Sequence, residues 1–283
     1  MIPSKFDYVR PTSVADAITA LVQGGDDAKI LGGGQSLIPV LRLRLAAPSV
    51  LVDLGGIPEL RGIRDEGDRI AIGAMTVYHD IVRDDLVQQH VMLLAQATQT
   101  VADSQVRHCG TLGGSLAHAD PAGDLGAVAL ALDAEFVIAG ASGTRTVPAA
   151  EFFLDYFTTA IGEGEILTEI RFPRYTGWGS RYEKFNRTAQ AWSMVAIAAA
   201  IKVESGTIAA ARVGLTNMGT TPIRATGVEQ ALIGQPATAD AVRVAAERVT
   251  EGTAAPSDAD AAADYREHLA RVLTGRAVLA AAG

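Results

Sequence analysis

Two glycine-rich segments combine backbone amides with hydroxyl side chains, the chemistry that holds a phosphate. The first reads GGGQS at residues 32–36, and the second reads TLGGS at residues 111–115. Glycine permits positive φ angles and lets a ligand come closer than a Cβ would allow, so successive N–H groups can converge on an anion. Ser36, Thr111 and Ser115 add hydroxyl donors. Each segment alone could be a plain tight turn, but together the two could bracket a pyrophosphate from both sides.

The two familiar nucleotide motifs do not fit these glycines. The dinucleotide fingerprint G-x-G-x-x-G would start at Gly32 and Gly34, but its third glycine position falls on Leu37. The P-loop needs a Gly-Lys-Ser/Thr sequence that neither segment has. Asp124, nine residues after Ser115, could accept hydrogen bonds from ribose or ribityl hydroxyls. Its alternative role is to cap the helix predicted for LGAVALAL.

Composition limits the possible partners. The chain has 283 residues, a formal net charge of −8 and one cysteine, Cys109. Nucleic-acid binding needs a clustered excess of Lys and Arg, so we expect no nucleic-acid partner. One cysteine cannot hold an iron–sulfur cluster, so another redox group must act if this chain moves electrons. No uncharged apolar stretch of about 18 residues predicts a membrane span, and no apolar N-terminal segment predicts a signal peptide, so we expect a cytoplasmic location.

Apolar patterning predicts the elements that position these segments. Residues 12–25 predict a helix with Val14, Ile18, Leu21 and Val22 on its buried stripe. Strands at 28–31 and 49–54, with a short helix interrupted at Pro39 between them, make a βαβ-like unit assigned to residues 1–60.

Two further units follow in the pattern. Strands at 69–74, 135–139 and 165–172, helices from about Thr76 and at 91–101, and a turn at 141–147 form a unit at residues 61–175. After a Gly-containing linker at 174–180, strands at 181–185, 193–203 and 208–216 precede helices at 239–250 and 261–282. That order predicts an antiparallel sheet covered on one face by helices, at residues 180–283.

Several sequence segments together carry a family resemblance. GGGQSLIPVLRLRLA, VDLGGIPEL, IGAMT, GTLGGSLAHADPAGD and RYEKFNRTAQAWSMVAIAAAI resemble the FAD-binding medium subunits of molybdenum hydroxylases, in particular the carbon monoxide dehydrogenase branch. The resemblance covers essentially the whole chain. It implies an α+β protein: a two-subdomain FAD-binding fold of the PCMH type, followed by a C-terminal domain that helps to cover the cofactor.

The resemblance also implies site residues, partners and a role. Its cofactor-binding positions in this sequence are Gly32, Gly33, Gly34, Gln35, Ser36, Thr111, Gly113, Gly114, Ser115, Asp124, Leu167, Lys184 and Trp192. No catalytic or metal-binding residue is expected, because the flavin supplies the redox chemistry. Electrons would pass from a molybdenum cofactor on a large subunit, through 2Fe-2S clusters on a small subunit, to FAD and an external acceptor. The implied assembly is a dimer of heterotrimers.

Individual residues keep alternative interpretations. Lys184 could place a cation near N1 and C2=O of the flavin, or could pair with Glu183 or another carboxylate. Trp192 could stack on the ring, or be a core aromatic that opens an apolar strand. His118 and Asp120 could bind a metal, but hydrogen bonding within their loop is favoured.

Other positions bear on contacts and on departures from the family. The alternating Leu-Arg segment at 41–45 could be a partner-facing surface or carry solvated arginines. Cys109 is expected to be a small, partly buried residue. Gly32 stands where alanine is common in the family, and the substitution should be tolerated. Ser115 stands where asparagine is frequent, which removes one donor.

Three functional readings compete. The first is the FAD subunit of a hydroxylase acting on carbon monoxide, an N-heterocycle or an aldehyde. The second is a self-contained FAD-dependent oxidoreductase, and the third is a cofactor-free binding module. We expect Gly33→Val or Gly113→Val to abolish FAD retention because the new side chain would occupy the phosphate's place.

Overall fold

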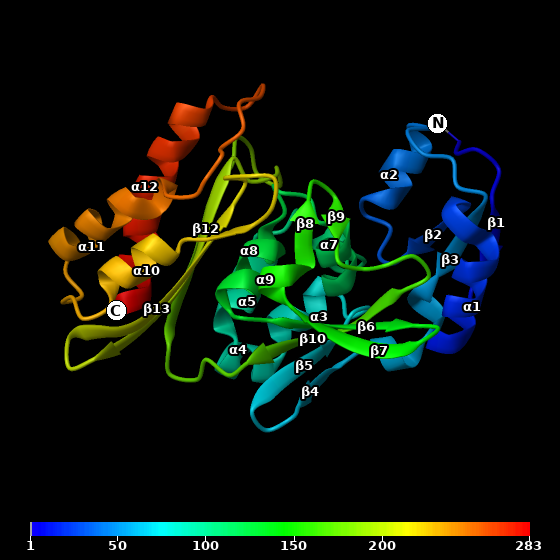
Figure 1. The fold of residues 1–283 in the computed structure, drawn as a ribbon, viewed down its shortest axis with the longest axis horizontal. Helices are drawn as coiled ribbons and strands as arrows, with labels where there is room; N and C mark the ends of the chain where they lie inside the picture. The colour runs from blue at the N-terminus through cyan, green and yellow to red at the C-terminus, as the bar shows by residue number, and fades with distance from the viewer. Residues whose placement is uncertain (1) are drawn as a thin grey trace.

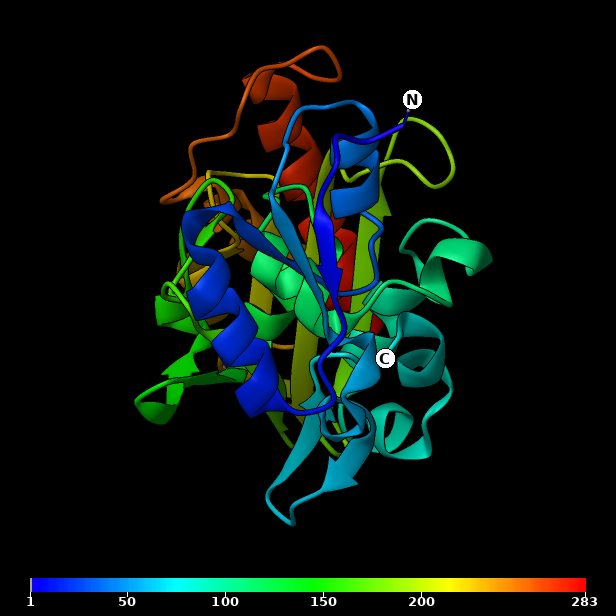
Figure 2. The same cartoon turned by 90° about the vertical axis from the view of Figure 1, so that its right-hand side faces the viewer.

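The first unit is a small parallel sheet with two helices. The computed structural model of the protein describes residues 2–283, and this unit forms one end of the molecule (Figure 1) and faces the viewer in Figure 2. Its strands run in the order β1-β3-β2. The elements are β1 (Asp7–Val9), α1 (Val14–Gly24), β2 (Ala28–Leu31), α2 (Leu37–Arg42) and β3 (Val50–Asp53).

Two details of this unit differ from the sequence prediction. In α1 the buried residues are Ala17 and Leu21, whereas Val22 is 60% exposed, so the predicted stripe was wrong at Val22. Pro39 does not interrupt a helix. It lies in the first turn of α2, where a backbone N–H would have no intrahelical partner and its absence does no harm.

The second unit is built on a five-stranded sheet in the middle of the molecule (Figure 1). The strand order is β4-β5-β10-β6-β7, with antiparallel neighbours. The strands are β4 (Ile63–Asp65), β5 (Arg69–Gly73), β6 (Glu135–Gly140), β7 (Gly143–Pro148) and β10 (Ile166–Pro173), and a small hairpin adds β8 (Phe153–Asp155) and β9 (Thr158–Thr159). The predicted turn at 141–147 was wrong. Most of it is β7, an edge strand whose exposed Thr and Arg side chains give no apolar signal.

Helices pack on this central sheet around a large apolar core. They are α3 (Tyr78–Arg83), α4 (Asp85–His90), α5 (Met92–Gln99), α6 (Ser104–Arg107), α7 (Leu112–His118), α8 (Asp124–Ala131) and α9 (Ala149–Phe152). The rings of Phe136 and Phe152 stack with centroids 3.8 Å apart in this core. Within residues 2–283, no helix is both long enough and apolar enough to span a bilayer.

The third unit is a four-stranded sheet with helices on both faces. Its strand order is β11-β12-β13-β14, and α10–α12 cover the outer face while α5 and α8 of the second unit contact the inner one (Figure 1). The prediction of a helical layer on one face was therefore incomplete. The elements are β11 (Gly179–Phe185), β12 (Val195–Glu204), β13 (Thr207–Thr216), β14 (Ile223–Arg224), α10 (Thr226–Leu232), α11 (Ala239–Ala246) and α12 (Ala263–Ala282).

Strand β12 explains why its sequence is apolar without alternation. Ala196, Ala198 and Ala200 belong to the core shared with α8, whereas the residues between them pack against the C-terminal helices. A strand buried on both faces reads as a continuous apolar run. The small alanine side chains let α8 come close to the sheet. The three sheets fall in turn within the ranges 1–60, 61–175 and 179–283, but the division into domains stays a prediction.

Gly275 in α12 offers a test of helix propensity at an uncrowded site. A Cβ added there would meet no other atom within 4 Å. Alanine is favoured over glycine in a helix interior, so Gly275→Ala should raise the free energy of unfolding by about 1 kcal/mol. The measurement is chemical unfolding of both chains followed by circular dichroism. A lower stability of the variant would contradict this assignment.

Candidate functional site

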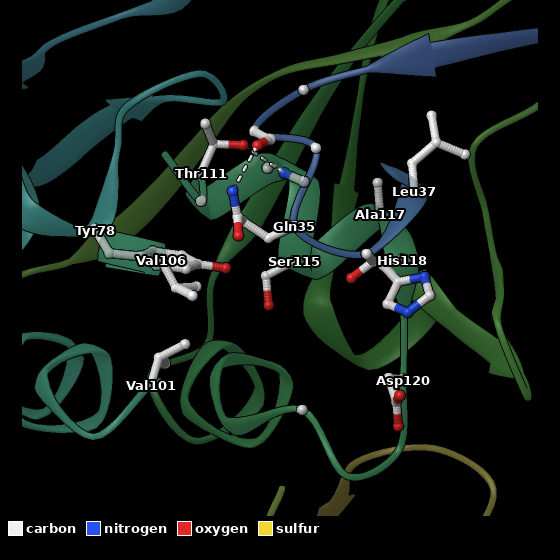
Figure 3. A pocket seen from close by; sticks show the side chains of 18 of the residues that line it. Gln35, Leu37, Tyr78, Val101, Val106, Thr111, Ser115, Ala117, His118 and Asp120 are labelled. Carbon is white, nitrogen blue, oxygen red and sulfur yellow. Dashed lines mark hydrogen bonds between the residues drawn. The ribbon is translucent and has the colours of Figure 1, made fainter. Parts of the chain in front are cut away.

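One cavity brings the predicted residues together. Its volume is about 600 Å³, and it lies where the three units meet, which is within the roughly 300–1,000 Å³ typical of ligand pockets. In the view of Figure 3, Tyr78, Val101 and Val106 lie on one side of Gln35 and Ser115, and His118 and Asp120 lie on the other. The cavity is lined by all of the positions predicted from the sequence: Gly32, Gly33, Gly34, Gln35, Ser36, Thr111, Gly113, Gly114, Ser115, Asp124, Leu167, Lys184 and Trp192.

The first glycine segment presents backbone donors that have no partner within the described chain. It follows β2, and Gly34 has a φ of +76°. Among residues 2–283, none accepts a hydrogen bond from the backbone N–H groups of residues 33–36. The Gln35 side chain donates to the Gly33 carbonyl at 3.2 Å and holds the turn (Figure 3). A row of free amides beside a cavity fits an anionic group.

The two glycine segments touch each other. A Cβ added at Gly33 would lie 2.2 Å from the Cys109 carbonyl oxygen, so only glycine fits this contact. A Cβ at Gly32 would lie 3.4 Å from Thr111 Oγ1, which is an ordinary contact distance. Position 32 therefore has room for an alanine, and the glycine found there leaves out only a methyl group, as the predicted tolerance assumed.

The second segment differs from a phosphate nest. Its amides are already bonded: Gly113 N–H donates to the Ala74 carbonyl at 2.8 Å, and Gly114 N–H donates to Thr111 Oγ1 at 3.1 Å, so that Thr111 caps α7. A Cβ at Gly113 would lie 2.5 Å from Ala74 Cβ. The two valine substitutions would strike neighbouring protein atoms, which is a further reason for a disturbed site. The expected loss of FAD retention stays a prediction. The group of this segment that can still donate to a ligand is the Ser115 hydroxyl.

Asp124 is buried, and its carboxylate accepts three side-chain hydrogen bonds. It is 5% exposed and is the first residue of α8, with Gly123 as the N-cap, so the capping role was wrong. Its Oδ2 accepts from Lys184 Nζ at 2.8 Å, and its Oδ1 accepts from Tyr182 and Ser193 hydroxyls at 2.7 Å each. Burial, and then the Asp124 charge, raise the pKa of Tyr182 well above its ordinary value, so this phenol remains a neutral donor.

Lys184 and Trp192 form the wall that the third unit contributes. The Lys184 side chain is 7% exposed and pairs with Asp124, whereas Glu183 pairs with Arg181. Trp192 is 56% exposed, so its interpretation as a core aromatic was wrong. It lies in the segment between β11 and β12, at the rim of the cavity.

An apolar wall that the sequence prediction missed completes the cavity. Its residues come from all parts of the first 175 positions and include Ile30, Leu54, Met75, Tyr78, Val101, Val106, Ile161 and Ile166. Burial raises the pKa of Tyr78 to about 12, with a hydrogen bond to Ser115 acting in the opposite direction. Two polar residues were also missed, Lys29 in β2 and Gln190 beside Trp192. Apolar residues in helices and strands are predicted to belong to the hydrophobic core. Among the missed residues, only Lys29, a charged residue in an apolar strand, could have indicated the cavity from the sequence.

The other candidates are His118 and Asp120, which also line the cavity, Cys109 and the Leu-Arg segment. Asp120 Oδ1 accepts from Ala122 N–H at 2.9 Å, as expected for a residue that stiffens its loop. The described residues contain no group of three or more His, Cys, Asp or Glu side chains placed to hold a metal. Cys109 is exposed, so its expected partial burial was wrong. In the Leu-Arg segment, Leu43 and Leu45 are exposed.

Comparison with known proteins decides the family. Residues 4–175 match the family model described as the FAD binding domain in molybdopterin dehydrogenase, and residues 180–281 match the CO dehydrogenase flavoprotein C-terminal domain. The chain belongs to the FAD-binding medium subunits of molybdenum hydroxylases. The fold class expected from the sequence is confirmed.

Individual medium subunits resemble the chain over nearly its full length. The carbon monoxide dehydrogenase medium chain of Hydrogenophaga pseudoflava is 42% identical, with 99% of this chain and 98% of that protein covered. The glyceraldehyde dehydrogenase medium chain of Sulfolobus acidocaldarius is 38% identical, with 98% of each covered. A solved carbon monoxide dehydrogenase of H. pseudoflava that lacks the Mo-pyranopterin moiety superposes with a TM-score of 0.96 at 43% identity, covering 99% of this chain and 98% of that one.

The cavity lies at the junction of the two matched regions. The glycine segments, Asp124 and Leu167 belong to the first, and Lys184 and Trp192 belong to the second. As a medium subunit, the chain is an FAD-dependent oxidoreductase component, and FAD is its cofactor.

Proposed function

We propose that this cavity holds FAD, and that the chain passes electrons through it from partner subunits to an external acceptor. The observation that carries the proposal is the row of unpartnered amides at residues 33–36 beside a cavity that both matched regions line. The amides and the Ser115 hydroxyl would hold the pyrophosphate. The two-sided clamp expected from the sequence is thus unequal, with backbone donors on one side and side-chain donors on the other.

Charge distribution favours one orientation of the cofactor. The cavity has two lysines, exposed Lys29 at the β2 end and buried Lys184 at the β11 end. FAD supplies the electron-carrying chemistry, and its isoalloxazine gains negative charge near N1 and C2=O when it is reduced. Lys184 pairs with Asp124, but its ammonium keeps an N–H that can donate to this part of the flavin. We therefore place the isoalloxazine near Lys184 and Trp192, with the adenosine toward β2.

Membership of the family supports a proposal for the partners and narrows the class of substrate. We propose that a large molybdopterin subunit and a small 2Fe-2S subunit complete the enzyme, as a dimer of heterotrimers, because the relatives are medium chains of multi-subunit dehydrogenases. The substrate reacts on the large subunit. Carbon monoxide, an aldehyde and an N-heterocycle are the candidates, since relatives 42%, 38% and 35% identical are named for carbon monoxide, glyceraldehyde and caffeine dehydrogenation. The cytoplasmic location stays a prediction from the sequence.

The test is purification of the chain together with the proteins encoded beside it. One FAD per chain should be released on denaturation, and molybdenum and iron should follow the partner subunits. Light scattering of the complex gives its stoichiometry. A chain that neither contains FAD nor takes it up after reconstitution would overturn the proposal. An isolated, FAD-loaded chain that oxidises a small substrate without partners would favour the self-contained enzyme.

Trp192 offers a test of the orientation. Because this side chain is 56% exposed, Trp192→Ala should leave the stability of the apoprotein within about 0.5 kcal/mol. A lost aromatic stack of about 0.5–1.5 kcal/mol should weaken FAD binding roughly two- to tenfold. Calorimetric titration with FAD measures the affinity, and brighter flavin fluorescence should accompany the change. Trp178, which packs at the edge of Tyr175 outside the cavity, provides the control position, and equal effects at both positions would contradict the orientation.

A further inference from the structure

The buried contact between Asp124 and Lys184 joins the two matched regions at the cavity wall. Asp124 begins α8, and Lys184 lies in β11. Their side chains are 4% and 7% exposed, and the Nζ–Oδ2 distance is 2.8 Å. Both residues also line the cavity. A cation and its counter-charge therefore face the ligand together.

The surroundings of Asp124 fix the position of its carboxylate. Tyr182 and Ser193 hydroxyls donate to Oδ1, and both residues are buried. A carboxylate offers about four acceptor positions, of which these two bonds and Lys184 fill three. With three of these positions filled, Asp124 has little capacity left to accept hydrogen bonds from the ribityl hydroxyls. Its hydrogen bonds instead suit the support of a neighbouring group.

Lys184 has few other ways to satisfy its charge. Its second contact is a long one, from Nζ to the Thr100 carbonyl at 3.4 Å. The third N–H remains available to a ligand, since an ammonium has three donors. Without Asp124, the Lys184 side chain would lose the contact that directs it and the negative charge that offsets its own.

We propose that Asp124 is a positioning residue that holds the Lys184 ammonium in place and offsets its charge, so that the pair together sets the reduction potential of the bound flavin. This inference rests on the proposed function, because it requires FAD with its isoalloxazine at this end of the cavity. A cation near N1 stabilises the reduced, more negative flavin, and a nearby carboxylate opposes that effect. The Asp124 charge thus keeps the potential lower than Lys184 alone would make it.

The test measures the flavin potential in the FAD-loaded complex by spectroelectrochemistry. Asp124→Asn keeps the size of the side chain and removes the charge, and it should raise the midpoint by about 30 mV or more, a tenfold change for a two-electron couple. Lys184→Met should lower the midpoint. The double variant should fall between the two single variants, near the wild type, because it restores a neutral wall. Tyr182→Phe removes a hydrogen bond to the same carboxylate without changing charge, and it should shift the midpoint by less than a third as much.

Stability of the apoprotein gives a second readout that needs no flavin. Asp124→Asn leaves a buried ammonium unpaired and should lower the thermal midpoint, and adding Lys184→Met should recover part of that loss. Strictly additive losses would contradict the pairing.

Each outcome separates the inference from the proposed function. An unchanged flavin midpoint in Asp124→Asn, or an equal shift in Tyr182→Phe, overturns the inference while FAD binding stands. If Asp124→Asn loses FAD and the double variant retains it, the unpaired lysine is the cause. The potential is then tested by comparing the double variant with Lys184→Met, and the inference requires the higher midpoint in the double variant. If both Asp124→Asn and the double variant lose FAD, Asp124 binds the cofactor directly and the inference is overturned. A wild-type complex without FAD overturns the proposed function itself.

Discussion

Gly33→Ala is expected to weaken FAD binding by roughly 5- to 150-fold. The added Cβ would lie 2.2 Å from the Cys109 carbonyl and 2.7 Å from Gly110 Cα, both backbone atoms. Overpacking of this kind requires about 1–3 kcal/mol. The apoprotein can relieve the strain by moving the segment at 32–36 outward. Binding must then return its free amides to the cavity, so the strain lowers affinity more than stability. Titration calorimetry with FAD measures the dissociation constant.

The neighbouring glycine is a matched control for this variant. At Gly32 the same methyl group would meet Thr111 Oγ1 at 3.4 Å, so Gly32→Ala should bind FAD within about twofold of the wild type. The two variants differ by one position and carry the same added atoms. Equal affinities for Gly33→Ala and the wild type would show that the contact between the two glycine segments does not shape the site.

Gly214→Ala is expected to destabilise the whole chain and to disturb the cavity from a distance. Gly214 lies in β13, and an added Cβ would come 2.2 Å from the Ala127 carbonyl and 3.3 Å from Ala131 Cβ in α8. Separating α8 from the sheet should lower stability by about 1–3 kcal/mol, or roughly 2–4 °C in the thermal midpoint for each kcal/mol. Because α8 begins at Asp124, FAD affinity should fall as well. Differential scanning calorimetry and FAD titration are the measurements.

Gly275→Ala is the control that separates the steric effect at Gly214 from the general effect of replacing glycine by alanine. It makes the same Gly-to-Ala change in an uncrowded helix, where stability should rise. Opposite signs at the two positions would tie the loss to the contact between α8 and β13. A Gly214→Ala variant as stable as the wild type would contradict the prediction, because it would show that the sheet accommodates the methyl group without moving away from α8.

Patterning predicted the elements well wherever burial was one-sided or continuous. β2 spans 28–31 as expected, and β6, β10, β12 and β13 agree with prediction within a few residues. The edge strand β7 was missed because solvent-exposed Thr and Arg carry no periodic signal. The second helical cover of the C-terminal sheet was missed for a different reason. The sequence does not tell whether a strand face made of alanines packs against a helix or a sheet or is exposed to solvent, because small residues are compatible with all three.

The site was predicted more completely in its polar residues than in its apolar ones. Glycines, hydroxyls and charges in unusual places stand out in a sequence, and all of the predicted positions line the cavity. Val101 and Ile161 line it too, but an isolated valine or isoleucine looks the same in a cavity wall as in a core. Hydrogen bonds were the least predictable part. The unequal roles of the two glycine segments depend on where the Ala74 carbonyl and the Thr111 hydroxyl lie.

The position of Lys184 and Trp192 late in the chain has a consequence for biosynthesis. A nascent polypeptide that has released only its first 175 residues can form both glycine segments, but it lacks the wall that β11 and the segment after it supply. The alanine face of β12 is likewise covered only when α8 is already in place. The cavity is therefore complete only after the last third of the chain has docked. Under the proposed function, FAD binding by the chain would report that its folding is complete.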